Sequence, residues 1–402
     1  MMEQDKDLQV IVAGHICIDL IPTFKTSAKS ELKDILIPGK LINMGRVNIS
    51  TGGIVSNTGQ ALMALGIRTK LMGKIGNDFF GEGILSLLRR RGAHEGMIVV
   101  DGEETSYTVV LVLPGFDRLF LHNPGANDTF CADDIDYGLV SQAKLFHFGY
   151  PPLMKKMFEN DGEELIRIFK KVKELGVTTS LDMSLPDPNS EAGKANWDKI
   201  LKNLLPYVDI YMPSIEETLL MLLPEEFFNL NKKYAGKDTL EHFDVNLLPV
   251  LGDKLVSYGA KVSVIKCGVK GYYLRTQGRD KLSAMGMAKP ADIDNWSDRE
   301  LLEESFHVDN VVSTLGAGDC SVAGFLAAFL NGRTVEDSIR IACAVGAQNV
   351  QVPDAVSGVK SWDETIAMIN ESWAKNRLSV AGRYWNYDDG RRIWVGNSDR
   401  SR

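Results

Sequence analysis

Hydrophobic residues occur along this 402-residue chain in two alternating patterns. Short, nearly continuous apolar runs, which are typical of strands buried on both faces, cover residues 8–21, 143–149, 177–183, 206–212 and 261–266. Between the runs, apolar residues recur every three or four positions, as in residues 163–175, which is the spacing of an amphipathic helix. The alternation predicts an α/β fold with a doubly wound, mostly parallel sheet flanked by helices.

A different pattern predicts a small second sheet. Polar and apolar side chains alternate through residues 40–50, and residues 107–113 and 118–122 flank a turn sequence, Pro-Gly-Phe-Asp. Such half-exposed strands indicate a small β-sheet lid, with strands roughly within residues 20–50 and 105–123.

Polar stretches without either pattern are expected to be additions to the sheet. Residues 224–244 and 276–305 are predicted to be insertions, and residues 377–402 a C-terminal extension after one domain over residues 1–376. The extension alternates aromatic and charged residues (RYWNYDDGRRIW). An aromatic platform for nucleic acid is the alternative to a plain surface extension, but an acidic chain favours the plain extension.

Composition narrows the class of protein. The net charge of −8 argues against a nucleic-acid partner, which would require a basic face. The acidic N-terminus has no apolar signal segment, and no apolar run approaches the ~20 residues needed to span a bilayer. The five cysteines are scattered, so they predict neither a zinc site nor a disulfide framework. We expect a cytoplasmic protein with no membrane partner.

Polar residues and glycines follow several of the predicted strands. Asp19 interrupts the first apolar run, Asp182 ends the third, and Glu217 and Gly268 follow the next two. Ligands of such sheets bind beyond the carboxyl ends of the strands. We therefore expect a binding site at this edge of the sheet.

A glycine turn within residues 311–332 is the most informative single segment. We expect the end of a strand, a tight turn and then a helix. Gly316, Ala317 and Gly318 are small enough for backbone N–H groups to surround an anion at the helix N-terminus. Asp319 comes next, and a carboxylate beside an anion hole suits the deprotonation of a hydroxyl group. The alternative is that Asp319 only caps the helix.

A second glycine turn lies nearer the N-terminus. Gly52 and Gly53 allow a ligand to approach the backbone closely, and Asn57 is expected in the first turn of the following helix. An amide that both donates and accepts hydrogen bonds suits a polyol. A plain helix N-terminus is the alternative.

Taken together, these segments resemble the ribokinase-like (PfkB-type) carbohydrate kinases, over about residues 8–370. One family signature is matched by residues 52–84 (GGIVSNTGQALMALGIRTKLMGKIGNDFFGEGI) and the other by residues 311–326 (VVSTLGAGDCSVAGFL). The resemblance implies transfer of the ATP γ-phosphate to a hydroxyl of a sugar or nucleoside, with Mg²⁺. It also implies a lid that forms the contact of a homodimer in many members.

The resemblance assigns roles to individual positions. Asp319 matches the general base, and Gly316, Ala317 and Gly318 match the anion hole. Glu217 matches the acid of an Asn-x-x-Glu motif that organises Mg²⁺ and phosphate through water. The expected substrate-binding residues are Asp19, Gly52, Gly53, Asn57 and Arg118. The expected nucleotide-binding residues are Ser214, Lys266, Gly268, Gly271 and Cys343.

Three positions depart from the family pattern. Ser214 replaces the Asn of Asn-x-x-Glu, and Ser313 and Leu315 replace the Asp and the second Thr of Asp-Thr-x-Gly-Ala-Gly-Asp. In potassium-activated members that Asp helps to bind the cation. The sequence therefore predicts Mg²⁺ dependence without strong potassium activation.

Three other functions are alternatives to a sugar kinase. A nucleoside kinase would need aromatic walls in the lid, for which Phe24, Phe116 and Phe120 are candidates. A non-catalytic sugar- or nucleotide-binding regulator is favoured by the departures at 214 and 313, but the intact glycine turn with its carboxylate argues against it. A nicotinamide-binding Rossmann enzyme is disfavoured because the turn lacks GxGxxG spacing.

Overall fold

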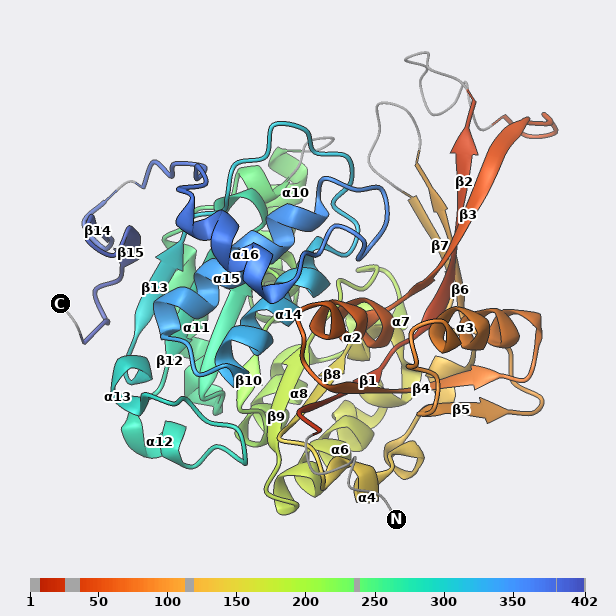
Figure 1. The fold of residues 1–402 in the computed structure, drawn as a ribbon, viewed down its shortest axis with the longest axis horizontal. Helices are drawn as coiled ribbons and strands as arrows, with labels where there is room; N and C mark the ends of the chain where they lie inside the picture. Colours follow the sequence, from red (N-terminus) through yellow and green to blue (C-terminus); the bar gives the residue numbers. More distant parts are fainter. Residues whose placement is uncertain (1–7, 26–36, 113–118, 235–238, 381, 401–402) are drawn as a thin grey trace.

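Two sheets organise the chain in the computed structural model, which describes residues 8–25, 37–112, 119–234, 239–380 and 382–400. The main sheet has the strand order β14-β15-β13-β12-β11-β10-β9-β8-β1-β4-β5, and the small sheet has the order β3-β2-β6-β7. In Figure 1 the small sheet stands at the upper right, beside the main sheet and its helices.

The strands are mostly short. Those of the main sheet are β1 (Val10–Gly14), β4 (Thr69–Gly76), β5 (Met97–Val100), β8 (Leu145–Gly149), β9 (Thr178–Asp182), β10 (Ile210–Tyr211), β11 (Val262–Lys266), β12 (Tyr272–Thr276), β13 (Glu300–Glu303), β14 (Asn386–Asp388) and β15 (Ile393–Val395). Those of the small sheet are β2 (Cys17–Phe24), β3 (Met44–Gly52), β6 (Tyr107–Leu111) and β7 (Leu119–Asn123).

Helices cover both faces of the main sheet, so alternate side chains of a strand enter different cores. Val10 and Val12 of β1 pack in one core with α2, α3, α14 and α15, whereas Ile11 and Ala13 pack in the other with α6, α8 and α11. Among the described helices, none has both the length and the apolar character required to cross a bilayer. The helices are α2 (Ile54–Ala64), α3 (Phe79–Arg89), α4 (Tyr137–Val140), α5 (Lys155–Phe158), α6 (Glu163–Glu174), α7 (Glu191–Lys194), α8 (Trp197–Leu204), α9 (Ile215–Leu222), α10 (Pro224–Lys233), α11 (Leu247–Tyr258), α12 (Arg279–Ser283), α13 (Ile293–Trp296), α14 (Ala317–Leu330), α15 (Val335–Asn349) and α16 (Trp362–Asn370).

The order of strand addition reverses in the middle of the main sheet. After β1 the chain adds β4 and β5 on one side, and then β8, β9, β10 and β11 on the other, with all these neighbours parallel. The remaining strands of the sheet pair antiparallel. A reversal of this kind opens a crevice at the carboxyl ends of the strands, where ligands of such sheets bind.

The fold prediction is confirmed, including the small sheet, with corrections to individual segments. Residues 8–21 are not one strand, because β1 ends at Gly14 and β2 begins the small sheet at Cys17. Residues 276–305 are not simply an insertion, because they contain β13. Residues 311–314 form no strand; Val311 and Val312 are about half exposed, and the N–H groups of Val312 and Ser313 donate to the carbonyl of Val350 after α15.

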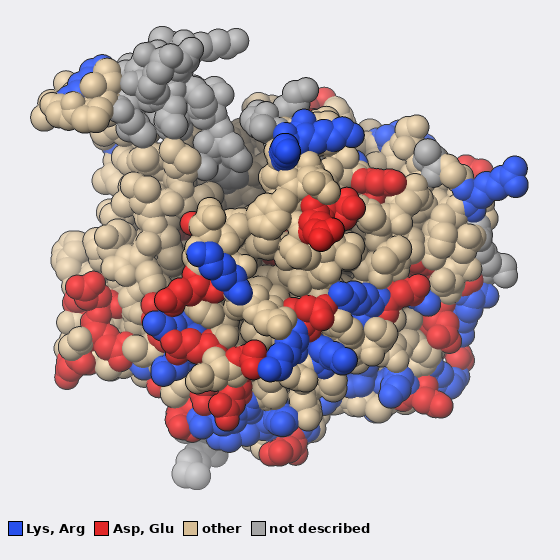
Figure 2. All heavy atoms as spheres, turned by 180° about the vertical axis from the view of Figure 1, so that it is seen from behind, with Lys and Arg blue, Asp and Glu red and all other residues tan. Residues whose placement is uncertain are grey.

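Part of the predicted C-terminal extension lies in the main sheet. β15 pairs with β13, and β14 pairs with β15, at the sheet edge seen on the left of Figure 1. The domain boundary after residue 376 stays a prediction. Seen from behind, basic and acidic side chains are interspersed over the lower half of the molecule (Figure 2).

The small sheet has an inner and an outer face. Asp19 of β2 is in register with Thr108 of β6, and Thr108 is in register with His122 of β7, so these three side chains share one face. The hairpin of β6 and β7 is confirmed, and its turn lies outside the described residues. The opposite face carries the exposed aliphatic side chains of Val47, Ile49, Leu119 and Leu121.

Candidate active site

The site is assembled where β1, β8 and β9 end side by side. Gly149, the last residue of β8, is in register with Gly14 of β1 and with Asp182 of β9. Helices α2 and α14 pack against each other close to this edge. The strand ends and the first turns of the two helices therefore bring together residues that are far apart in the sequence.

Asp319 lies in the first turn of α14, with a side chain that is almost completely buried. The Asn57 amide donates to Oδ2 of Asp319 at 2.8 Å, and the Tyr150 hydroxyl donates to Oδ1 at 2.6 Å. Burial raises the pKa of the Asp319 carboxyl, while the hydrogen bonds from Tyr150 and Asn57 and the charge of Lys266 oppose this rise. The carboxylate is thus held by side chains of other elements.

The turn before Asp319 requires its first glycine. Gly316 has a φ of 70°, and a Cβ atom there would lie 2.2 Å from the carbonyl oxygen of Ala355. Both facts exclude a larger side chain. The helix begins at Ala317 without a side-chain cap. The Ala317 N–H donates to the carbonyl of Thr314 at 3.2 Å, so an anion would be bound by the following N–H groups of the first turn.

Asp19 lies against the second glycine turn, but on the small sheet and not at the end of the first main-sheet strand. A Cβ atom on Gly52 would lie 2.2 Å from Oδ2 of Asp19. Burial raises the pKa of Asp19 to about 6, against hydrogen bonds from Cys17 and Thr108, and the charge of Asp319 adds to the rise. Asp19, Gly52, Asn57 and Asp319 therefore lie in one cluster, and their role in substrate binding stays a prediction.

Two histidines extend this cluster toward the small sheet, and the sequence analysis did not single them out. Nε2 of His15 lies 3.3 Å from Nε2 of His122, and Nδ1 of His122 lies 3.0 Å from the Thr108 hydroxyl. Burial lowers the pKa of His122 to about 4 and holds the pKa of His15 well below its usual value, so both rings are neutral at pH 7. Gly53, with a φ of 81°, lets the His15 ring approach, because a Cβ atom there would lie 2.6 Å from Nδ1 of His15.

The other side of Asp319 carries a buried ion pair. The Lys266 ammonium group at the end of β11 contacts Oδ1 of Asp182 at the end of β9. Burial raises the pKa of Asp182 to about 7, against Lys266, and the charges of Glu217 and Asp319 add to the rise. The Lys266 side chain passes 3.9 Å from the position that a Cβ atom on Gly318 would occupy. It therefore lies beneath the glycine turn of residues 316–318, which is called the anion turn below.

Ser214 and Glu217 bind each other at the start of α9. The Ser214 N–H donates to the Glu217 carboxylate at 2.6 Å, and the Glu217 N–H donates to the Ser214 hydroxyl at 3.2 Å. This reciprocal cap explains a serine at position 214 without any ligand. No group of three or more His, Cys, Asp or Glu side chains in the described part of the chain is arranged to hold a metal ion by itself.

Mg²⁺ does not need such a group. It usually takes one or two carboxylates together with water and phosphate oxygens. Asp182, Glu217 and Asp319 are three buried carboxylates that influence one another beside the single ammonium group of Lys266, and Oδ2 of Asp182 has no hydrogen-bond partner. The excess of buried negative charge fits a hydrated divalent cation near Glu217.

The remaining predicted nucleotide-binding residues surround the end of β11. Gly271 has a φ of 100°, and a Cβ atom there would lie 1.9 Å from the carbonyl oxygen of Glu303. Close packing against β13 is therefore sufficient to require this glycine, without any nucleotide. Gly268 has a φ of 55°, and Cys343 is buried on α15 within electrostatic range of Tyr272. Arg118 lies outside the described residues.

Tyr150 is the most important residue that the sequence analysis missed. It directly follows β8, so its place after a buried apolar run was a usable signal. Its contact with Asp319 depends on an unusual backbone conformation, with φ of 66° and ψ of 40°, which no spacing of residues indicates.

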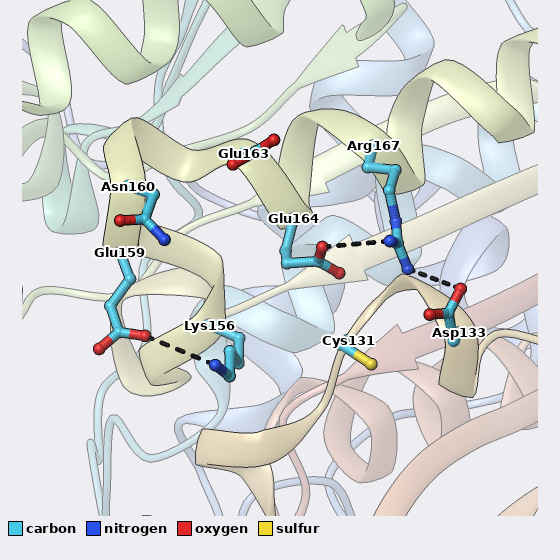
Figure 3. A pocket seen from close by; sticks show the side chains of 8 residues that line it. All are labelled: Cys131, Asp133, Lys156, Glu159, Asn160, Glu163, Glu164 and Arg167. Carbon is cyan, nitrogen blue, oxygen red and sulfur yellow. Dashed lines mark ion pairs between the residues drawn. The ribbon is translucent and has the colours of Figure 1, made fainter.

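A surface cavity of about 290 Å³ lies away from this cluster, between the start of α6 and the segment before α4 (Figure 3). Its charged side chains are largely paired with each other: Lys156 with Glu159, and Arg167 with both Glu164 and Asp133. The cavity shares no residue with the strand-end cluster.

Several known proteins resemble this chain in sequence or in fold. An uncharacterized sugar kinase of Archaeoglobus fulgidus is 24% identical over 298 residues, which cover 74% of this chain and 97% of that protein. Fructokinase-2 of Solanum lycopersicum is 23% identical over 376 residues, covering 90% and 95%. The structure of an Arabidopsis thaliana ribokinase complexed with ribose and ATP has the same fold, with a TM-score of 0.65 at 20% identity over 90% of this chain and 98% of that one. The family model described as pfkB family carbohydrate kinase matches residues 7–362. Since this match spans most of the sequence, the chain belongs to the pfkB family of carbohydrate kinases.

Proposed function

We propose that this sugar kinase transfers the γ-phosphate of ATP to a hydroxyl of a small sugar, with Asp319 as the general base. The observation that carries the proposal is the position of Asp319, a buried carboxylate in the first turn of α14, directly after an uncapped glycine turn. A base in this position can take the proton of the attacking hydroxyl, while the adjacent anion hole binds the transferred phosphoryl group.

The proposed reaction has one chemical step. The acceptor hydroxyl gives its proton to Asp319 as its oxygen attacks the γ-phosphorus, and the bond between that phosphorus and the β,γ-bridging oxygen breaks to release ADP. The uncapped N–H groups at the start of α14 would face the charge that develops on the transferred phosphoryl group. Mg²⁺, when bound near Glu217, neutralises charge on the phosphates.

The acceptor is proposed to lie on the small-sheet side of Asp319. The Asp19 carboxylate would accept hydrogen bonds from adjacent hydroxyls, and the Asn57 amide, whose Oδ1 is buried without a partner, would accept another. Gly52 and Gly53 leave the backbone accessible, and Arg118 is proposed as a further contact from the lid.

The nucleotide is proposed to lie on the opposite side, over the end of β11. Lys266 lies beneath the anion turn, and its ammonium group would contact the phosphates. The other proposed contacts are Ser214, Gly268, Gly271 and Cys343.

A nucleoside acceptor is a second candidate, because Phe120 lies on the inner face of the small sheet, in register with Val110. An aromatic ring there suits stacking on a base. The outer face suggests a homodimer, since its exposed aliphatic side chains would be covered by a second copy. We place the kinase in the cytoplasm, because its five cysteines are free and its proposed substrate is ATP.

Phosphoryl transfer to a panel of hexoses, pentoses and nucleosides tests the function directly. We expect Mg²⁺-dependent ADP release with a small sugar and no several-fold activation by potassium over sodium. Asp319→Asn should fold normally and lower kcat by about 10²–10⁴-fold, the usual contribution of a positioned base. Near-normal turnover of that variant would remove Asp319 from the mechanism, and turnover of nucleosides alone would favour the second candidate.

A further inference from the structure

Tyr150 packs against one of the two hydrophobic cores and also binds the proposed base through its hydroxyl. Its hydroxyl donates to Oδ1 of Asp319 at 2.6 Å, while the Asn57 amide donates to Oδ2. The Tyr150 ring is about 6.0 Å from the His15 ring, at the end of β8 where the order of strand addition reverses. Tyr150 therefore lies on the proposed acceptor side of Asp319, near the His15 ring.

The backbone of Tyr150 is strained. Its φ of 66° and ψ of 40° are in the left-handed region, which a bulky side chain rarely adopts. The Tyr150 N–H donates to the carbonyl of Asp182 at 3.3 Å and so holds this conformation. Pro151, next in the chain, would favour an extended backbone at Tyr150 and therefore adds to the strain. Strain of this kind persists where the surrounding structure enforces it, and it concentrates at functional sites.

The two donors leave Asp319 able to accept a proton. A carboxylate offers about four lone-pair directions, so Tyr150 and Asn57 occupy one on each oxygen and leave others for the acceptor hydroxyl. A donor to a carboxylate also favours its charged form. This matters here because Asp319 is buried, and a buried carboxyl group prefers to be protonated and would then be useless as a base.

We propose that Tyr150 is a positioning residue for the general base: its phenol fixes the orientation of Asp319 and keeps the buried carboxylate ionised. The inference rests on the proposed role of Asp319 as base. The pKa shifts agree with the geometry, because the Tyr150 hydrogen bond is the largest influence that opposes the rise caused by burial.

Other charged groups also face Asp319 and must be allowed for. Lys266 of β11 favours the ionised form of Asp319. Asp19 of β2 and Asp182 of β9 are carboxylates whose own titration Asp319 shifts, and Glu217 of α9 acts on Tyr150. All four are unchanged in the variant proposed below, so a difference from the parent protein reports on the Tyr150 hydroxyl.

Tyr150→Phe keeps the ring and removes only the hydroxyl. Activity requires ionised Asp319, so kcat/KM rises with pH through the pKa of this group, and loss of a donor should move that acid limb to higher pH. We expect kcat/KM to fall roughly 10-fold at a pH on the acid limb and less than about twofold on the plateau, as for loss of one hydrogen bond to a charged group. An unchanged limb, or an equal loss at every pH, would overturn the proposal.

The same titration can be followed without any substrate. Carbon-13 NMR of the labelled Asp carboxyl groups, with the Asp319 signal assigned through Asp319→Asn, should show Asp319 titrating at higher pH in Tyr150→Phe. The matched control is Tyr137→Phe on α4, which removes a buried hydroxyl that lacks a hydrogen-bond partner and should leave the Asp319 titration unchanged.

A second substitution protects the test against misfolding of the first. Replacing Tyr150 by 3-fluorotyrosine gives a stronger donor of nearly the same shape, and it should move the acid limb to lower pH; a shift to higher pH would contradict the proposal. The outcomes also separate the two hypotheses. If Asp319→Asn keeps normal turnover, the base is wrongly assigned, whereas if it is inactive and Tyr150→Phe does not alter the Asp319 titration, only the inference about Tyr150 fails.

Discussion

The proposed acceptor side of the site contains the buried carboxylates of Asp19 and Asp319, whose charge is costly to bury. Asp19 is only 6% exposed, and its partners Cys17 and Thr108 are weak donors compared with a cation. Burial accordingly raises the pKa of Asp19 to about 6, so the group is mostly ionised at pH 7 and protonated at pH 5. Sugar binding that depends on this carboxylate should weaken in the same interval.

The Michaelis constant for the sugar should therefore rise as the pH falls through about 6. Asp19→Asn should raise it by about 10- to 100-fold at pH 7.5, the effect of losing hydrogen bonds to a charged group, and should abolish its pH dependence near 6. The KM for ATP should hardly change. Asp101→Asn, in an exposed residue that binds Asn77, is the control. A variant that kept its sugar KM and lost ATP affinity would place the acceptor elsewhere.

Single residues of the site differed in how far the sequence could indicate them. Asp319 and Asn57 were predictable because a carboxylate or an amide after a glycine turn has a chemical meaning of its own. Tyr150 and His122 were not, because their places depend on a left-handed backbone and on the register between β6 and β7. Such features arise from tertiary contacts. The roles assigned to all these residues stay predictions.

At the scale of elements, the two faces of the small sheet differ in the side chains that they carry. Its inner face carries Asp19, Thr108 and His122 toward the cleft. Its outer face exposes the side chains of Ile49 and Leu121 by about half, at 50% and 56%, far more than an interior position would. Contiguous aliphatic groups of this kind mark interaction surfaces, and a second copy of the chain offers a matching face.

We expect the protein to sediment as a dimer and the double variant Ile49→Glu/Leu121→Glu to sediment as a monomer, because charge at an apolar contact is strongly unfavourable. Val99→Glu, at an exposed position on β5 of the main sheet, is the matched control and should stay dimeric. Analytical ultracentrifugation at several concentrations measures both. A monomeric parent protein, or a dimeric double variant, would be contrary to this assignment.

Elements were predictable where a single pattern decided them. The parallel strands are buried on both faces, so their sequences are continuous apolar runs, and α14 is indicated by apolar residues at helical spacing. The sequence does not indicate β13, because ELLE carries two glutamates. They are buried in the sheet with partners from β12, α15 and the C-terminal segment. The valine pair at 311 and 312 predicts a strand because both side chains are apolar, but in the structure both are about half exposed.

At the scale of the whole molecule, the C-terminal segment is part of the main sheet. Asp399 is buried and accepts from Nε of Arg299 at 3.0 Å and from the Glu300 N–H at 2.8 Å. Arg299 is itself only 3% exposed and pairs on its other side with Glu336 of α15. One ion network thus joins β13, α15 and residues that follow β15.

Asp399→Ala should lower the free energy of unfolding by about 1–3 kcal/mol, because it leaves a buried guanidinium group with fewer acceptors. The kinetic constants should change little, since the network is remote from Asp319. Urea unfolding measures the effect, with Asp389→Ala at an exposed position as the control. Equal stability of the two variants would mean that the segment contributes nothing through this network.

The strands of the small sheet come from two separate pieces of chain, β2 with β3 and β6 with β7, and the two pieces pair where β2 lies beside β6. The proposed acceptor site would thereby be divided between two stretches of a gene. A recombination event between residues 53 and 106 would join Asp19 of one parent to Thr108 and His122 of the other. The pairing of β2 with β6 would then combine strands from two different proteins. Exchange of acceptor preference among relatives, in nature or by grafting, therefore requires both pieces to be inherited together.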